Sequence, residues 1–408
     1  MQCGLLGRKL SHSYSPQIHN RLGNYRYSLF PTEPEDLESF LKNAEFDGIN
    51  VTIPYKKAVI PYCSELSDIA KRLGAVNTIV KRADGTLIGH NTDYFGFMSM
   101  VAQSGLKLSG KKVLVLGSGG ASNTAVAVLE SLGANTIVIS RSGENNYSNL
   151  HLHKDAFAIV NTTPVGMYPE TDQSPVDLVN FPNLCGVLDV IYNPAKTKLL
   201  QQAESLGLTA CNGLWMLVAQ AKESAEWFTR KAIDNTTIPM IHQQLRQQME
   251  NLILIGMPGC GKSTIGKLLA ERTGKTFVDA DEKIVELANK SIPEIFSQDG
   301  EDTFRKIESQ AIAQLGKQSG LVIATGGGCV TRIENYPQLH QNGTIIWLQR
   351  KISSLPTDGR PLSQAGSLQA MYEVRKPLYE SFADIAVKNN ATEKEALEAI
   401  LTAVNWED

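Results

Sequence analysis

A glycine-rich segment in the second half of the chain has the residue types and the spacing that bind nucleotide phosphates. Residues 256–264, GMPGCGKST, match the pattern G-x-x-x-x-G-K-[ST]. Glycines let the backbone wrap around a phosphate and direct its N–H groups inward. Lys262 would neutralise charge on the β- and γ-phosphates, and the hydroxyl of Ser263 would be a ligand of Mg²⁺. The segment predicts an ATP and magnesium site, whose other phosphate contacts are Gly259, Cys260, Gly261 and Thr264.

Charged residues that could act on a second substrate follow this segment. Asp279 and Asp281 come directly after a short apolar run in FVDADEKI. Because Asp281 precedes the helical pattern EKIVELA, it could instead be the N-terminal cap of that helix. The segments GEDTFRKIE, VIATGGG, TDGRPLS and YEVRKPLYE supply Arg305, Gly327, Arg360 and Arg375.

A second glycine-rich turn lies in the first half of the chain. It follows the apolar run KVLVL and consists of Gly117, Ser118, Gly119, Gly120 and Ala121. In the first β–α turn of a dinucleotide-binding fold, glycines leave room for a pyrophosphate, although Ser122 stands here at the third glycine position. The next apolar run ends at Ser140 and Arg141, where an NAD-binding lobe carries an acidic residue. An arginine at this point favours NADP, because its guanidinium can bind a 2′-phosphate.

The elements that must hold these residues follow an alternating pattern. Short apolar runs alternate with helical patterns over the whole chain, which is typical of α/β folds with mainly parallel sheets. We expect a two-lobed N-terminal part with a Rossmann-like cofactor lobe, and then a P-loop domain with a parallel sheet. The expected boundaries are a first lobe at 1–100, to which 210–232 return, a cofactor lobe at 101–209, a linker at 233–250 and the P-loop domain at 251–408.

The amino-acid composition limits the classes of partner and cellular location that we expect for this chain. The 408 residues are 42% hydrophobic and 20% charged, with a formal net charge of −3, so no global positive field would attract nucleic acid or an anionic membrane. Six cysteines without CxxC spacing favour reduced thiols and a cytoplasmic location. We find no apolar run near the ~18 residues of a membrane span, and no signal peptide. The sequence leaves the oligomeric state open.

The C-terminal set of motifs, in this order, resembles shikimate kinase over about residues 250–408. The resemblance implies transfer of the ATP γ-phosphate to the 3-hydroxyl of shikimate. It implies that Asp281 holds and helps to activate the substrate hydroxyl, while Arg305 and Arg375 clamp the carboxylate. It also implies that the Gly327 backbone approaches the substrate, that Asp279 assists the magnesium shell, and that Arg360 closes over the transferred phosphate.

Six separated segments of the first half resemble shikimate dehydrogenase over about residues 1–232. They are SYSP at 13–16, NVTIPYK at 50–56, GAVNT at 74–78, NTD at 91–93, the glycine turn, and NGLWMLVAQA. The resemblance implies that Lys56 and Asp93 form the catalytic pair, because a ketone reduction needs a proton on oxygen as well as a hydride on carbon. It further implies substrate contacts from Ser13, Ser15, Thr52, Asn77, Tyr192 and Gln220, and cofactor contacts from Val190 and Gly213.

One segment departs from this family pattern. Only residues 142–160 separate Arg141 from NTTPVGM, where larger family members carry a longer, helix-bearing segment. We therefore expect a reduced cofactor lobe, in which Lys154 is a second candidate for the 2′-phosphate.

Two other functions fit parts of this pattern. The same folds could act on quinate or a related carboxylated polyol, because Ser13, Ser15, Arg305 and Arg375 favour a carboxylate without identifying the ring. A nucleotide-binding regulator without catalysis would lack the chemical residues, and Lys56, Asp93, Lys262 and Asp281 are all present. The leading hypothesis is a bifunctional enzyme that forms shikimate and then phosphorylates it, with small molecules as its partners.

Overall fold

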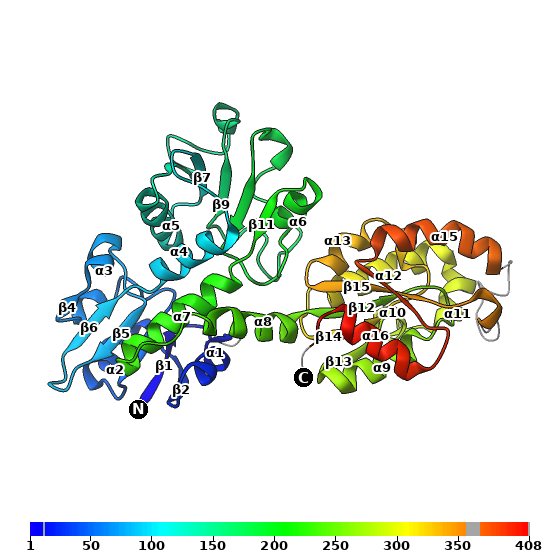
Figure 1. The fold of residues 1–408 in the computed structure, drawn as a ribbon, viewed down its shortest axis with the longest axis horizontal. Coiled ribbons are helices and arrows are strands. Elements are labelled where there is room, and N and C mark those ends of the chain that lie inside the picture. The colour runs from blue at the N-terminus through cyan, green and yellow to red at the C-terminus, as the bar shows by residue number, and fades with distance from the viewer. Residues whose placement is uncertain (11–12, 356–367, 407–408) are drawn as a thin grey trace. The chain divides into compact units, whose positions relative to one another are not determined.

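The computed structural model describes residues 1–10, 13–355 and 368–406. By internal packing the chain forms two compact units. The first consists of Met1–Gly166, Gln173–Tyr192 and Gln202–Gln244, and the second of Met167–Asp172, Asn193–Gln201 and Leu245–Asp408. The described residues form three β-sheets, two in the first unit and one in the second (Figure 1).

The first sheet is mixed and has six strands in the order β2-β1-β3-β5-β6-β4. Strand β1 is parallel to β2 and β3, whereas β5 is antiparallel to β3 and β6. Its strands are β1 (Gln2–Gly7), β2 (Arg26–Pro31), β3 (Gly48–Val51), β4 (Glu65–Leu66), β5 (Thr78–Lys81) and β6 (Leu87–His90). The helices α1 (Ser15–Leu22), η1 (Pro34–Asp36), α2 (Leu37–Asn43), η2 (Ile60–Tyr62) and α3 (Asp68–Leu73) lie between them in the chain.

The second sheet is parallel and has the order β11-β10-β9-β7-β8. Its strands are β7 (Lys112–Leu116), β8 (Asn135–Ile139), β9 (Ala158–Asn161), β10 (Gly186–Asp189) and β11 (Thr209–Cys211). Between them run α5 (Gly120–Ser131), η3 (Leu150–His153), η4 (Leu178–Asn180) and α6 (Lys198–Ser205). The strand order reverses at β7, which lies between β8 and β9, and such a switch point is where open α/β sheets bind ligands.

Two long helices join the sheets of the first unit. They are α4 (Asp93–Ser104) and α7 (Leu214–Thr229), which pack against each other (Figure 1). The approach is close at Gly96, where a Cβ would lie 2.8 Å from the carbonyl oxygen of Met216. Helix α7 also packs on α1, β3 and β5.

The third sheet is also parallel, with the order β13-β14-β12-β15-β16. Its strands are β12 (Asn251–Ile255), β13 (Thr276–Asp279), β14 (Leu321–Ala324), β15 (Gly343–Gln349) and β16 (Ile385–Lys388). Strands β12 and β14 are buried along their whole length, which explains why their sequences are continuous apolar runs. These strands and their helices form one core, which includes Leu254, Ile265, Ile323 and Ile346.

The described helices of the second unit lie between these strands in the chain, except that α16 follows the last strand. They are α9 (Lys262–Thr273), α10 (Ala280–Ala288), α11 (Ile292–Glu294), η5 (Ile295–Asp299), α12 (Gly300–Gly316), η6 (Cys329–Thr331), α13 (Asn335–His340), η7 (Ile352–Ser354), α15 (Leu368–Phe382) and α16 (Glu393–Ala403). Helix α8 (Thr237–Met249) occupies most of the segment expected as a linker.

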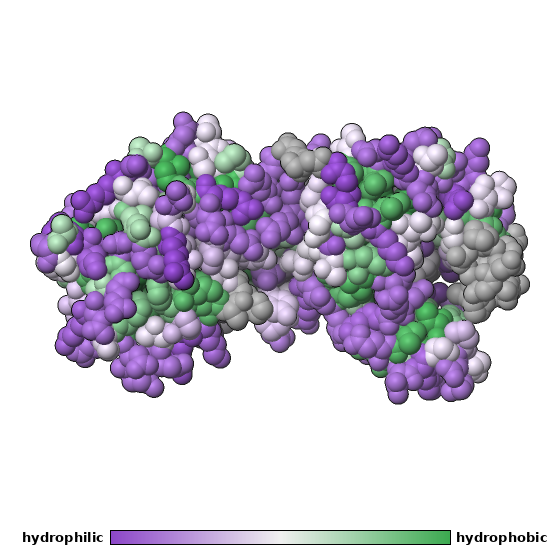
Figure 2. Space-filling model, turned by 90° about the horizontal axis from the view of Figure 1, so that it is seen from below, coloured by the Kyte–Doolittle hydropathy of each residue, from purple (hydrophilic) through white to green (hydrophobic). Residues whose placement is uncertain are grey.

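In the described part of the chain, no helix combines the length and apolar character needed to cross a bilayer. Polar residues cover most of the face shown in Figure 2, and hydrophobic residues form small separate groups on it.

Candidate active sites

The phosphate-loop segment lies between β12 and α9, as its sequence predicts. Gly261 ends the loop with a φ of 100°, and a Cβ there would lie 2.6 Å from the side-chain nitrogen of Asn389. That nitrogen donates to the carbonyl oxygen of Cys260 at 2.8 Å, so the residue that follows β16 fixes the loop. The buried ammonium of Lys262 donates to the carbonyl oxygens of Gly256 at 2.9 Å and Met257 at 3.1 Å. The loop thus holds one positive charge against its own backbone, at the N-terminus of a helix.

Ser263 and Asp279 form the end of this site that suits a metal ion. The Ser263 hydroxyl donates to Oδ2 of Asp279 at 2.8 Å, although the two residues lie on α9 and β13. In the part of the chain that the structure describes, no group of three or more His, Cys, Asp or Glu side chains could hold a metal. One hydroxyl beside one carboxylate still fits Mg²⁺, because this ion keeps several waters and takes further oxygens from substrate phosphates.

The same carboxylate caps the next helix. Oδ1 of Asp279 accepts from the backbone N–H of Asp281 at 3.1 Å, so Asp279 is the N-cap of α10. The alternative that Asp281 caps this helix is therefore wrong, because Asp281 already lies in its first turn. Its carboxylate instead lines a cavity. Burial, and then the negative charge of Asp279, raise the pKa of Asp281, while Lys262 and Arg305 oppose the shift.

Two buried arginines lie on either side of the glycine run after β14. Arg305 on α12 is 5% exposed, and a Cβ at Gly328 would lie 2.3 Å from its guanidinium. Arg375 on α15 donates to the carbonyl oxygen of Gly327 at 3.2 Å. Gly328 is needed because the Arg305 guanidinium occupies the space of a side chain, whereas a Cβ at Gly327 would lie 2.6 Å from the Pro258 ring.

Glu308 belongs to this site, and sequence analysis did not assign it a role. Its Oε2 accepts from Arg305 at 2.8 Å, whereas the buried Oε1 has no hydrogen-bond partner among the described residues. A Cβ at Gly326 would lie 2.6 Å from that Oε1 and 3.3 Å from Oδ1 of Asp281. Burial raises the pKa of Glu308, and the charge of Arg305 opposes the shift. A signal was present, since a glutamate three residues after an arginine faces it on a helix.

These side chains line one cavity of about 550 Å³. Its predicted members are Gly259, Gly261, Lys262, Ser263, Thr264, Asp279, Asp281, Arg305, Gly327 and Arg375. Arg350 and Phe296 also line it and were not predicted. Cys260 is buried, and Arg360 lies outside the described residues. A phosphate loop, a carboxylate and two guanidinium groups in one cavity can bring a nucleotide to an anionic acceptor that bears a hydroxyl.

The first unit holds a lysine–carboxylate pair. Lys56 follows β3 in a turn, and Asp93 is the first residue of α4. The Lys56 ammonium donates to Oδ2 of Asp93 at 2.7 Å, with side-chain exposures of 31% and 16%. The pair is partly accessible, so it could exchange a proton with a bound molecule.

Asn77 and Gln220 meet beside this pair through Thr92. The backbone N–H of Thr92 donates to Oδ1 of Asn77 at 2.7 Å, and its hydroxyl contacts Oε1 of Gln220 at 3.4 Å. Beneath them the Ser224 hydroxyl lies 2.9 Å from that of Thr92, and it accepts from the Asn50 side chain at 2.7 Å. Asn50, Thr78, Thr92 and Ser224, which we call the buried polar network, join β3, β5, α4 and α7.

The predicted serines lie at the start of α1. Ser15 is buried, and its backbone N–H donates to the Ser13 hydroxyl at 3.2 Å. The N-cap of α1 is Tyr14, whose side chain makes no capping bond, so neither serine is that N-cap residue. The Tyr14 ring lies edge-on to the ring of Tyr192, with centroids 6.2 Å apart. Thr52, after β3, donates its N–H to the carbonyl oxygen of Leu6 on β1 at 2.9 Å.

The glycine turn of residues 117–121 lies between β7 and α5. Gly117 has a φ of 107°, and a Cβ there would lie 2.9 Å from the Thr162 hydroxyl. Cβ atoms at Gly119 and Gly120 would meet nothing within 4 Å, and Ser118 and Ala121 are exposed. Because Gly119 is the N-cap of α5, the first free N–H groups of this helix lie at an open surface, which fits a pyrophosphate.

The segment after β8 is short. Arg141 is exposed directly after Ser140, whose N–H donates to the carbonyl oxygen of Asn145 at 3.1 Å. Between β8 and β9 the structure has the 3-10 turn η3 and no α-helix, in keeping with the expected reduction of this lobe. Lys154 is exposed at the end of η3.

Val190 and Gly213 lie against each other after β10 and before α7. A Cβ at Gly213 would lie 2.0 Å from the carbonyl oxygen of Val190. The close approach allows the chain to pass from the second sheet into α7, which carries Gln220.

Comparisons with known proteins match both halves. The family model for shikimate kinase matches residues 258–405, and the model for the shikimate dehydrogenase substrate binding domain matches residues 5–79. An NADP(+) shikimate dehydrogenase of Clostridium perfringens (strain SM101 / Type A) is 36% identical over 265 residues, which covers 60% of this chain and 97% of the relative.

Solved structures resemble the N-terminal part. The structure of shikimate dehydrogenase 1 from Peptoclostridium difficile has a TM-score of 0.56 and 38% identity, and the match covers 60% of this chain and 97% of that one. A quinate dehydrogenase from Corynebacterium glutamicum in complex with NAD has a TM-score of 0.55 and 28% identity. The match covers 60% of this chain and 98% of that one.

Proposed function

This chain belongs to the shikimate dehydrogenase family in its N-terminal part and carries a shikimate kinase domain after it, and we propose the residues that perform its two reactions. The chain is a bifunctional shikimate-pathway enzyme. It reduces 3-dehydroshikimate to shikimate with NADPH, and it phosphorylates shikimate to shikimate 3-phosphate with ATP.

In the reduction, Lys56 delivers the proton and Asp93 positions it. The 2.7 Å ion pair directs the ammonium from the turn after β3 toward the start of α4. A ketone oxygen placed at Lys56 would accept a proton as negative charge develops on it. Asp93 also has an oxygen available for a substrate hydroxyl, because only its Oδ2 is used by Lys56.

Substrate orientation comes from the residues around this pair. Asn77 and Gln220 present amide groups that the buried polar network holds from below. Ser13 and Ser15 would donate to the substrate carboxylate, and Thr52 and Tyr192 would limit the position of the ring. Fixed donors lower the entropy cost of reaching the reactive geometry.

The cofactor belongs at the switch point of the second sheet. Bound NADPH supplies the hydride. Residues 117–121 offer a helix N-terminus to its pyrophosphate, and the exposed Arg141 offers a guanidinium to the 2′-phosphate. Ser140 and Lys154 would add polar contacts there, whereas Val190 and Gly213 would shape the nicotinamide end.

In the phosphoryl transfer, Lys262 and the loop amides neutralise the phosphates. Ser263, with Asp279 behind it, would hold Mg²⁺. Asp281 accepts the proton of the attacking hydroxyl, and Arg305 and Arg375 hold the acceptor carboxylate. Glu308 positions Arg305 through the 2.8 Å hydrogen bond, so that the guanidinium group of Arg305 faces the cavity. Arg360 would act on the transferred phosphate.

One observation carries the kinase assignment: a single cavity gathers the phosphate loop, Asp281 and both arginines. The test is a coupled assay of the whole chain with 3-dehydroshikimate, NADPH, ATP and Mg²⁺. We expect shikimate 3-phosphate to form, with NADPH oxidised before ATP is consumed. NADPH oxidation without phosphorylation of the product would contradict the combined function.

The quinate alternative is open to a direct comparison, since one structural relative is a quinate dehydrogenase. We expect NADP⁺ reduction with shikimate to have a higher kcat/KM than with quinate, and ATP consumption to follow the same order. A preference for quinate in both assays would reverse the assignment.

We infer a cytoplasmic enzyme with small-molecule partners. All six cysteines are free thiols in the structure, in keeping with a reducing compartment.

A further inference from the structure

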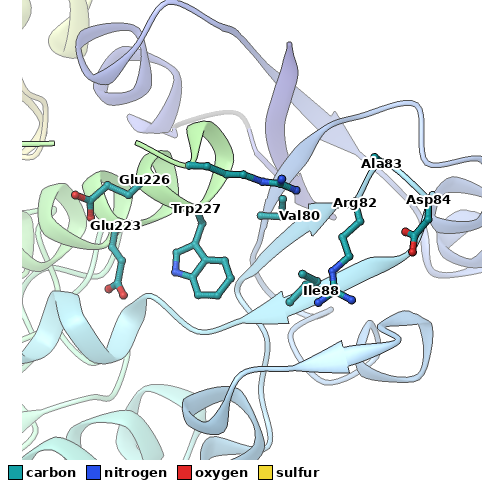
Figure 3. Close-up of a pocket in the computed structure, with 9 residues that line it drawn as sticks. Val80, Arg82, Ala83, Asp84, Ile88, Glu223, Glu226 and Trp227 are labelled. Carbon is teal, nitrogen blue, oxygen red and sulfur yellow. The ribbon is translucent and has the colours of Figure 1, made fainter. Parts of the chain in front are cut away.

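The first unit has a second cavity that neither reaction uses. It has a volume of about 730 Å³ and lies between the β5–β6 hairpin and the C-terminal turns of α7 (Figure 3). Its lining residues are Val80, Arg82, Ala83, Asp84, Ile88, Glu223, Glu226, Trp227 and Arg230. None of the residues proposed above for either reaction is among them.

An aromatic ring forms the middle of this cavity. Trp227 is half-buried, and one of its faces is covered by His90, with ring centroids 4.3 Å apart and planes inclined by 26°. The apolar side chains of Val80 and Ile88 come from the facing strands (Figure 3). A planar apolar ring would find stacking and edge contacts here.

Charged side chains of both signs line the cavity around that ring. Figure 3 shows Glu223 and Glu226 on the α7 side of Trp227, and Arg82 and Asp84 on the hairpin side. Arg82 forms an ion pair with Glu65, and both side chains are exposed, so exchanging that partner for a bound anion costs little. Arg230 adds an exposed guanidinium at the end of α7.

One carboxylate oxygen of Glu223 has no hydrogen-bond donor among the described residues. Its Oε1 lies 3.3 Å from Nε2 of His90, but its Oε2 is buried and has no hydrogen-bond partner among the described residues. A neighbouring carboxylate is already satisfied, because Oε1 of Glu226 accepts from Lys222 at 2.8 Å and from the N–H of Ile233 at 2.7 Å. The unpartnered Oε2 has no exposed surface, but the Glu223 side chain lines the cavity, so a cationic group there would be attracted to this incompletely satisfied carboxylate.

We propose that this cavity binds a small zwitterion with a planar ring, such as an aromatic α-amino acid. The carboxylate binds at Arg82 and Arg230, the ammonium at Glu223, and the ring lies against Trp227. This inference needs neither of the proposed reactions, since binding can be measured without turnover.

The position of the cavity couples it to the reductase site. His90 ends β6, and Asn91, Thr92 and Asp93 follow it directly. Glu223 lies one turn after Gln220 on α7. Glu223 and Trp227 both lie on α7 and both contact His90, which precedes Asp93 by three residues. A ligand held by them is therefore linked through His90 to the start of α4 and through α7 to Gln220, so its occupancy changes the KM of the reduction and leaves the KM of the phosphorylation unchanged.

The binding test is calorimetric titration of the full chain with L-phenylalanine, L-tyrosine and L-tryptophan. We expect saturable binding of at least one of them. 3-Phenylpropionate lacks the ammonium and 2-phenylethylamine lacks the carboxylate, so each should bind about tenfold more weakly than phenylalanine, or worse. No saturable binding, or equal binding of either analogue, overturns the proposal.

Substitutions locate the site. Arg82→Ala, Glu223→Gln and Trp227→Leu should each weaken binding about tenfold or more, whereas Arg26→Ala, an exposed arginine on β2, should not. Retained shikimate-dependent NADP⁺ reduction shows that a variant is folded, and Arg82→Ala alone suffices if Trp227→Leu does not fold. Unchanged affinity in Arg82→Ala and Glu223→Gln overturns the assignment.

The coupling test uses the ligand at saturation. We expect the KM for 3-dehydroshikimate to change about fivefold or more, with no change in the kinase KM for shikimate. A bound ligand that leaves the reductase KM unchanged overturns the coupling. Failure of the reductase assay itself would instead count against the proposed function, since the titration does not depend on it.

Discussion

The two active regions of this chain are built in different ways. In the kinase domain, the residues proposed to hold the nucleotide are consecutive, and the turn after β12 leads directly into Lys262, Ser263 and Thr264 at the start of α9. In the dehydrogenase part, the proposed catalytic pair and its neighbours lie on or beside β3, β5, α4 and α7, and Thr92 and Gln220 are 128 residues apart.

The two sites differ in the interactions that hold their side chains in position. The phosphate loop is shaped mainly by its own glycines and by the helix that follows, and Asn389 adds one distant contact. The reductase site depends on buried hydroxyl and amide groups that satisfy one another, and each partner lost leaves a desolvated polar group behind. We therefore expect the kinase site to be sensitive to local charge, and the reductase site to distant packing.

The largest expected effect is that of Lys262→Ala. Loss of this buried charge should lower the kinase kcat about 1,000-fold or more, with the reductase kcat unchanged, because charge neutralisation dominates phosphoryl transfer. Separate assays of the two reactions measure it. Lys267→Ala on the exposed face of α9 is the matched control and should leave both activities intact. Loss of both activities in folded Lys262→Ala would contradict the expectation that the two sites act independently.

Lys56→Ala should lower the reductase activity and leave the kinase activity unchanged, which is the reverse of Lys262→Ala. The reductase kcat should fall about 100- to 10,000-fold, as expected for a lost proton donor, while phosphorylation of added shikimate continues. The neighbouring exposed Lys57→Ala is the control, since it changes the same charge one residue away. If Lys57→Ala lowered the rate as much as Lys56→Ala, the 2.7 Å pair with Asp93 would not be the proton source.

A smaller effect is expected in the pH profile of the kinase. The pKa of Asp281 is raised by burial and by Asp279, so kinase activity should fall with decreasing pH at a higher pH than an ordinary aspartate would set. Asp279→Asn removes a negative charge, which lowers the pKa of Asp281 and moves this acid limb to lower pH. The measurement is kcat/KM against pH for both reactions.

The reductase profile of the same variant is the control and should not move. An acid limb that stayed in place, or moved to higher pH, would mean that another group titrates.

The smallest effect is expected for Ser224→Ala. Its hydroxyl contacts Asn50, Thr78 and Thr92, so its loss should cost about 1–3 kcal/mol of unfolding free energy in the first unit and raise the reductase KM a few-fold. Urea unfolding followed by reductase activity tests this, with the kinase KM expected to be unchanged.

Thr229→Ala on the same helix separates the network from the helix. Like Ser224, Thr229 donates to the carbonyl oxygen four residues earlier, at 2.7 Å, but it is not part of the buried polar network. Equal destabilisation by both substitutions would show that the buried polar network adds no stability beyond the hydrogen bond within the helix.

Particular residues show how far the sequence alone reaches. The glycine patterns predicted two glycine-rich turns between a strand and a helix, and the structure has both turns, because such a spacing is a local property of the chain. The short segment after Arg141 indicated the missing crossover helix. Between Asp279 and Asp281, however, sequence could not decide which one caps α10, because both precede a helical pattern. It also named Lys56 and Asp93 without showing that they touch.

The sequence by itself determined the order of the two activities, the phosphate loops and the residue types available for proton transfer, since these depend on near neighbours in the chain. Only the tertiary structure decided what those residues contact. It placed Glu308 against Arg305 and Gly326, joined Asn77 to Gln220 through Thr92, and left one oxygen of Glu223 without a partner beside Trp227. The physical reason is that hydrogen-bond satisfaction in a buried site depends on groups that parallel strands and returning helices bring together from distant positions in the chain.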